Sequence, residues 1–455
     1  METKKNKYEI DMCNGSIMDK LITFSVPLML SGILQLLFNA VDIIVVGRYT
    51  GDGALAAVGS TTALINVFVN LFIGISLGAN VLAARYYATG QEKEMSDTVH
   101  TSILLALISG IVIGILGIAM AKTALKLMDT PEDVLNLATV YMRIYFMGMP
   151  FFMLYNYGAA ILRAVGDTKR PLYFLILSGV VNALLNLYLV IHFHMGVAGV
   201  AIATVISQCL SCILVLSCLH RSKGSYQLRF SKLRLRGRYV RQIFQVGIPA
   251  GIQSTIINFS NVLLQSSVNS FGSVAMAGYT AANNILGFLY VSVNSITQAC
   301  MSFTSQNYGV GKWKRMDRVL IDCLILSFVA MMILGNSAYF FGPKLLTIYT
   351  SNSKVIQCGM EILLYTTVTY FLCGFMDLFP GALRGMGRSG VPMILSIIGT
   401  VGTRIVWIFW IFPNHRSLDI LFISYPASWI ITIVLQVICY YFVRKQLYAK
   451  MRAEA

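Results

Sequence analysis

Long apolar runs, separated by short polar connections, follow one another through nearly the whole chain. A helix needs about 20 apolar residues to cross the hydrocarbon core of a membrane. Windows of that length predict twelve spans, at 21–46, 54–82, 99–121, 134–162, 171–193, 196–219, 243–269, 274–303, 319–341, 359–383, 392–412 and 418–443. The runs are continuously apolar and do not alternate in short strands, which favours helices over a transmembrane barrel. The pattern predicts an all-α integral membrane protein with twelve transmembrane helices.

The two halves of the chain repeat each other. The phrase LRAVGDTKRP (162–171) returns as LRGMGRSGVP (383–392), and RYYATGQEKEM (85–95) returns in register as QNYGVGKWKRM (306–316). Each half therefore contains one copy of a six-span unit. Because six is even, both copies enter the membrane from the same side, and their pseudo-two-fold axis runs along the membrane normal. We expect two six-helix bundles related by that axis.

The domain organisation follows from this repeat. We expect an N-terminal cytoplasmic segment, a first six-helix lobe, a basic inter-lobe loop, a second six-helix lobe and a cytoplasmic tail. Their predicted boundaries are 1–20, 21–219, 220–242, 243–443 and 444–455.

Charge supports a membrane protein and fixes its orientation. The chain is 56% hydrophobic and only 12% charged, about half the charged fraction of a soluble domain, which is about 25%. Most of the Lys and Arg residues fall in alternate connections, and the positive-inside rule then places both termini in the cytoplasm. The net charge of +16 is thereby explained without nucleic acid. The loop 220–241 contains no acidic residue and is expected to lie against anionic lipid.

Amide and carboxylate side chains recur inside the predicted spans, where they are costly and usually face protein or a water-filled cavity. They share helical faces in both halves, and they are either hydrogen-bonded contacts between helices or the lining of a polar passage. We take as candidates for that lining Gln35, Asn39, Asn66, Asn70, Asn258, Asn261, Gln265, Asn283, Asn284 and Asp377.

Asp42 differs from these candidates because the repeat aligns it with Asn261, so only the first half keeps a carboxylate there. A carboxylate in the membrane interior can exchange a proton or bind Na⁺. Asp377 has either a structural or a substrate-contacting role. Arg143 and Arg404 also lie inside spans, and we expect structural partners for both.

Nucleotide-binding and zinc-protease motifs are missing from the sequence. There is no Walker A phrase and no HExxH, so neither ATP-driven export by this chain nor a metalloprotease is indicated. Nine scattered cysteines lie mostly in apolar runs and predict no metal site. We therefore expect no enzyme and no cofactor.

The chain resembles the multidrug and toxin extrusion (MATE) family over about residues 15–445. The resemblance is carried by PLMLSGILQLLFNAVDIIVVGRYTGDGALAAVG (27–59), by the two LRxxG phrases and by VNALLNLYLVIHFHMGVAGVAIATVISQ (181–208). It implies two six-helix lobes and a secondary antiporter that exports small-molecule drugs or toxins in exchange for Na⁺ or H⁺.

By position, the resemblance makes Asp42 the acid of a cation-coupling site and Asn182, Asn186 and Thr204 its neighbours. Many relatives have Asp at the place of Asn186. Asn retains an oxygen that can ligate Na⁺ but is not a proton acceptor, which leaves Na⁺ and H⁺ open as the coupling ion. Relatives with an acid in the seventh helix have no counterpart here, since 249–269 contains no Asp or Glu.

Other interpretations fit less of the sequence. A lipid-linked oligosaccharide flippase of the same superfamily would usually have further spans and a more cationic cavity. The charged loop signature of the major facilitator class is missing, and a non-transporting scaffold would not need Asp42 or the buried amide faces. We expect a monomer in the cell membrane, in contact with lipid and with small-molecule substrates.

Overall fold

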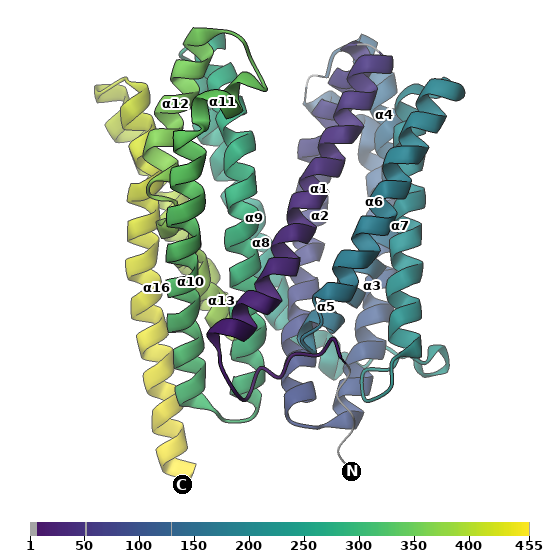
Figure 1. Ribbon diagram of the computed structural model, residues 1–455, viewed down its shortest axis with the longest axis vertical. Helices are drawn as coiled ribbons and strands as arrows, with labels where there is room; N and C mark the ends of the chain where they lie inside the picture. The colour runs from purple at the N-terminus through teal and green to yellow at the C-terminus, as the bar shows by residue number, and fades with distance from the viewer. Residues whose placement is uncertain (1–6, 51, 129, 455) are drawn as a thin grey trace. The chain divides into compact units, whose positions relative to one another are not determined.

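The computed structural model describes residues 7–50, 52–128 and 130–454, and all the regular structure within these ranges is helical. The first half contains α1 (Met18–Tyr49), α2 (Asp52–Ala88), α3 (Glu92–Leu127), α4 (Glu132–Met147), α5 (Met149–Ala164), α6 (Lys169–Leu187), the π-helix η1 (Tyr188–His192) and α7 (Gly196–Arg221). The short 3₁₀ helix η2 (Phe230–Lys232) lies in the inter-lobe loop. Figure 1 shows the course of the chain.

The second half repeats this order. It contains α8 (Gly237–Asn269), α9 (Ser273–Gly309), α10 (Trp313–Phe340), α11 (Gly342–Thr347), α12 (Ser353–Thr367), α13 (Tyr370–Gly385), α14 (Gly390–Ser396), η3 (Ile397–Gly402), α15 (Thr403–Val406), η4 (Trp407–Ile411), η5 (Phe412–Asn414) and α16 (Leu418–Glu454). Here η3 and η4 are π-helical and η5 is 3₁₀.

Nine helical stretches of the described chain are long and apolar enough to cross a membrane, and two bent pairs raise the number to eleven. We count α8 as the twelfth span on its length of 33 residues. The mean hydropathy of α8 is low because Asn, Gln and Ser recur along the helix. The prediction of twelve transmembrane helices is thus confirmed.

Two of the predicted spans are not straight helices. The span expected at 134–162 bends by 46° between α4 and α5, where Pro150 follows Gly148 and lacks the N–H that would continue the helix. The span expected at 359–383 bends by 47° between α12 and α13. Each bent pair still forms one of the predicted spans, and the bend is a feature that the predicted residue ranges did not specify.

The helices form two compact units. Unit 1 contains the described part of Met1–Met12 together with Val26–Gly251, and unit 2 contains Cys13–Ser25 and Ile252–Ala455. Within unit 1, α5 packs against α2, α3 and α7; within unit 2, α13 packs against α9, α10 and α16. The lobe boundaries predicted near 219 and 243 stay a prediction.

The repeated LRxxG phrase ends the central helix of each unit in the same way. Gly166 and Gly387 have φ values of 93° and 81°, a left-handed conformation that favours glycine. After α5, the N–H of Asp167 donates to the carbonyl of Leu162 at 2.9 Å; after α13, the N–H of Arg388 donates to the carbonyl of Leu383 at 2.9 Å. Both ends are Schellman caps, so the repeat preserves a helix stop.

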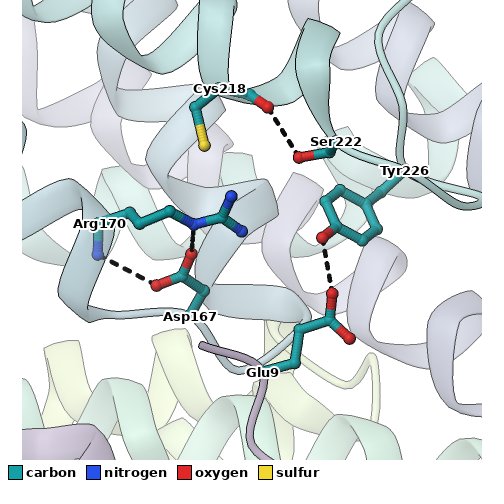
Figure 2. A network of polar contacts seen from close by, with 6 residues as sticks. All are labelled: Glu9, Asp167, Arg170, Cys218, Ser222 and Tyr226. Atoms are coloured by element: carbon teal, nitrogen blue, oxygen red, sulfur yellow. Dashed lines mark hydrogen bonds and ion pairs between the residues drawn. The ribbon is translucent and has the colours of Figure 1, made fainter. Parts of the chain in front are cut away.

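Part of the segment before α1 is held against unit 1 by polar contacts of Glu9, and Figure 2 shows one of them beside the neighbouring Asp167–Arg170 pair. The Glu9 carboxylate accepts hydrogen bonds from the hydroxyls of Tyr226 at 2.7 Å and Tyr87 at 2.8 Å. Nearby, Arg170 forms an ion pair with Asp167. Burial raises the pKa of the Asp167 carboxyl, and the Arg170 guanidinium opposes that shift.

Glycines bring α2 and the start of α8 into backbone contact within unit 1. Gly74 and Gly78 face Gly247 and Gly251, with the same four-residue spacing on both helices. A Cβ on Gly74 would lie 3.0 Å from the Gly247 carbonyl oxygen, and one on Gly78 would lie 3.1 Å from the Gly247 nitrogen. Small residues at this spacing let transmembrane helices approach closely.

We predict that Gly78→Val lowers the thermal unfolding temperature of the purified protein, because the side chain would collide with the backbone of α8. Gly59→Val is the control, since a Cβ at Gly59 has nothing within 4 Å. Differential scanning fluorimetry in detergent measures both. Equal unfolding temperatures for the two variants would contradict the close packing of α2 and α8.

Candidate functional site

Asp42 lies on α1 and is 8% exposed. The Nδ2 of Asn186 on α6 donates a hydrogen bond to its Oδ1, and the hydroxyl of Thr204 on α7 lies 3.5 Å from its Oδ2. Three helices of unit 1 therefore converge on one carboxylate.

Asn182 joins these three residues into one network. Its Nδ2 donates to the Thr204 hydroxyl at 3.4 Å, and its Oδ1 lies 3.3 Å from the Asn186 Nδ2. Asn182 and Asn186 are four residues apart on α6 and so share a face. We call Asp42, Asn182, Asn186 and Thr204 the Asp42 cluster. The structure thus brings together all four residues of the predicted coupling site.

The chemistry of the Asp42 cluster is that of an oxygen-rich site with one negative charge. Asn186 Oδ1 is buried and has no hydrogen-bond partner among the described residues. A buried acceptor without a donor is unusual. Carboxylate, amide and hydroxyl oxygens are the ligands that hard cations prefer, and a carboxylate alone can take a proton. The cluster can therefore accept one monovalent cation or one proton.

Two aromatic residues next to the Asp42 cluster were missed by the sequence reasoning. Tyr141 and Tyr145 of α4 lie within electrostatic reach of Asp42, with ring centroids 6.2 Å apart. Gln208 interacts with Tyr145 and lies one turn beyond Thr204 on α7. The four-residue spacing of the two tyrosines was the available signal.

The other unit 1 candidates are separate from the Asp42 cluster. Gln35, Asn39 and Asn66 are exposed and Asn70 is half-buried, and none of the four forms a described hydrogen bond to the cluster. Their assignment to a cavity lining stays a prediction.

Among the unit 2 candidates, Asn258, Gln265 and Asn284 are exposed and Asn283 is half-buried. Their role in a cavity lining also stays a prediction.

Asp377 is half-buried on α13, within electrostatic reach of Arg384. The Nη2 of Arg384 donates to the Gln253 Oε1 at 2.7 Å. This arrangement leaves both roles proposed for Asp377 open.

The two arginines inside predicted spans differ in environment. Arg143 is exposed on α4, whereas Arg404 is buried and donates to the Oδ1 of Asn261 at 2.7 Å. The partner of Arg404 is therefore an amide.

Twelve hydrophobic helices in two repeated units, with a polar cluster buried inside one of them, define a multi-pass membrane protein built as a transporter. The family model for MatE matches residues 27–188 and again residues 249–410. The chain therefore belongs to the MatE family, as the resemblance implied. Members of this family are transporters, which confirms the expectation that the chain is not an enzyme.

Curated relatives match over nearly full length. The probable multidrug resistance protein YoeA of Bacillus subtilis is 28% identical over 95% of this chain and 95% of its own. The probable multidrug resistance protein NorM of Thermotoga maritima is 24% identical over 86% of this chain and 84% of its own. A crystal structure of MATE in complex with MaL6 has a TM-score of 0.89 at 20% identity, covering 98% of this chain and all of that one. That likeness supports the fold.

We predict that Asn186→Ala lowers the thermal unfolding temperature, because it removes the amide donor to Asp42. A hydrogen bond to a charged group contributes about 1.5–3 kcal/mol. The loss should be smaller when Asp42→Asn is already present. A double-mutant cycle of unfolding temperatures measures this coupling, and purely additive shifts would show that the two side chains do not interact.

Proposed function

We propose that the protein is a secondary active multidrug antiporter, which exports cationic or amphipathic small molecules in exchange for Na⁺ or H⁺ by alternating access. The observation that carries the proposal is the Asp42 cluster, a single carboxylate buried among amide and hydroxyl oxygens of three helices. The multidrug resistance names of the curated relatives support the substrate class.

Coupling requires that the ion and the substrate favour different conformations. With the site vacant, the charge of Asp42 draws a cationic substrate toward unit 1 or holds α1 in the shape that binds it. Entry of a cation or proton from outside neutralises Asp42. The attraction for the substrate is then lost, and the substrate leaves on the outer side.

The choice between the two ions depends on Asn186. As an amide it offers its unpaired Oδ1 to Na⁺ but cannot take a proton, so protons have only Asp42 as an acceptor in the cluster. These features favour Na⁺ as the coupling ion, although a proton can still bind Asp42.

The proposed setting is the cell membrane, with both termini in the cytoplasm and the protein acting as a monomer. The distribution of Lys and Arg along the chain supports this orientation. Lipid contact is proposed for the basic loop 220–241, where Arg229, Lys232 and Arg234 are exposed.

We predict that Asp42→Asn abolishes ion-driven efflux, because the amide cannot be neutralised by a cation. In proteoliposomes, efflux of a fluorescent organic cation would be followed under imposed Na⁺ or H⁺ gradients. The wild-type protein should respond to one of the two gradients, and the variant should reach the rate of empty liposomes. Asn336→Ala, at an exposed position of α10 outside the candidate lining, is the control for the substitution of a polar span residue.

Gradient-driven efflux at the wild-type rate in Asp42→Asn would overturn the proposal. Transport of a lipid-linked oligosaccharide, with no efflux of organic cations under either gradient, would instead support the flippase interpretation.

A further inference from the structure

Arg404 lies at the centre of a polar arrangement in unit 2 that the proposed function does not use. It is carried by α15, a short α-helical stretch between the π-helices η3 and η4, and is 3% exposed. Interruptions of this kind are frequent at functional sites.

The guanidinium of Arg404 is held by an amide, a hydroxyl and an aromatic ring. Its Nη1 donates to the Asn261 Oδ1 at 2.7 Å and to the Ser260 hydroxyl at 3.4 Å, both on α8. Its Cζ lies 4.7 Å from the centre of the Tyr425 ring on α16. A cation over the face of a tyrosine ring is attracted by the ring's electrostatic field, more strongly when both are removed from water. Two helices of unit 2, α8 and α16, therefore hold the positive charge that α15 carries.

Carboxylates take no part in this arrangement within the described chain. The groups that face Arg404 from the neighbouring helices are the phenols of Tyr279 on α9 and Tyr425, and the thiol of Cys373 on α13. The two phenols hydrogen-bond to each other at 2.9 Å. A buried charge is usually paired with an opposite one. Here amide and ring dipoles replace that partner.

In the internal repeat, this arrangement is the counterpart of the Asp42 cluster. The two stretches matched by the family model begin at Pro27 and Pro249, and the same separation of 222 residues joins Asn182 to Arg404.

The flanking helices correspond in the same way, with small shifts of register. Asn261 lies 219 residues after Asp42, and Tyr425 lies 221 residues after Thr204. The first, fifth and sixth spans of each half thus supply equivalent positions, and in each unit those side chains contact one another.

The two equivalent arrangements have opposite charge. Unit 1 has an acid and no arginine in its cluster, whereas unit 2 has an arginine and no acid. We propose that the Arg404 guanidinium is a tethered cation, which occupies in unit 2 the place that the exchanged cation takes in unit 1. The proposal rests on the proposed function of the Asp42 cluster.

Two consequences follow for transport. Unit 2 binds no exchangeable cation at this place, so the transporter uses one coupling ion, at Asp42. The contacts among α8, α15 and α16 do not depend on ion binding, whereas those among α1, α6 and α7 do. The ion-dependent change of conformation is thereby confined to unit 1.

The test looks for cation binding in Asp42→Asn variants, in which the cluster of unit 1 no longer has a carboxylate to bind a cation. Unfolding temperatures of purified variants would be measured against Na⁺ at fixed pH and constant ionic strength, since a ligand that binds the folded state raises its stability. Asp42→Asn alone should show no cation response. Adding Asn261→Asp should raise the unfolding temperature through an ion pair with Arg404, still without a cation response.

Adding Arg404→Asn as well should create a cation response, because the new acid then lacks its tethered partner. The variant that keeps Arg404 should show no shift over the Na⁺ range that shifts the triple variant, so its apparent affinity lies at least tenfold lower, outside that range. Arg143→Asn, which removes the same charge from an exposed position, is the matched control and should leave the response absent.

The proposal is overturned if Asp42→Asn alone responds to cations. It is equally overturned if Asn261→Asp creates a response while Arg404 is present, or if the triple variant gains none. If the triple variant does not fold, the Asn261→Asp measurement decides alone. Failure of the proposed function is distinguishable, because the wild-type protein would then show no cation response that Asp42→Asn removes.

Discussion

A carboxylate between helices in the membrane interior must find hydrogen-bond donors or a counter-ion, and the Asp42 cluster is built around that requirement. The donors come from α6 and α7, so the charge of one residue decides how three helices of unit 1 pack. The available partners are an amide and a hydroxyl, which stabilise the charge without neutralising it. In the proposed antiport, the neutralising species comes from outside the protein and is the ion that is exchanged.

A comparison of the two repeated units shows which features they share and in which they differ. Both central helices end in the same Schellman cap, at Gly166 and Gly387, because a left-handed residue is needed wherever this turn is made. The two equivalent groups of polar residues carry opposite charge, from Asp42 in one unit and from Arg404 in the other. The order and ends of the helices follow the repeat, whereas the buried charges do not.

Much of this could be predicted from the sequence. Long hydrophobic runs predict membrane-spanning helices, because only such segments are stable in the hydrocarbon core with their backbone groups hydrogen-bonded internally. The repeated phrases predict that the two units have the same order of helices. The residues alone predicted a functional carboxylate at Asp42, since a charge inside a span is rare, and two amides that share a face of α6. The resemblance to the family is what grouped Asn182, Asn186 and Thr204 with Asp42.

The remaining features depend on packing between distant segments. The sequence of 134–162 reads as one apolar run, and only the contacts of α4 and α5 reveal the bend at Gly148. The partner of Arg404 could not be predicted, because many amides were available and the neighbours of a π-helical segment do not follow the periodicity of an α-helix. Tyr141 was missed because aromatic residues in a span are usually apolar contacts.

The central claim is that a cation and a drug compete through Asp42. Equilibrium binding of a fluorescent organic cation to the purified protein, titrated with Na⁺ and separately with protons, measures this directly. The account predicts that one of the two ions weakens drug binding with a dependence of first order in that ion, as a single site requires. Drug affinity that is independent of both ions, or that depends on the square of either concentration, would contradict it.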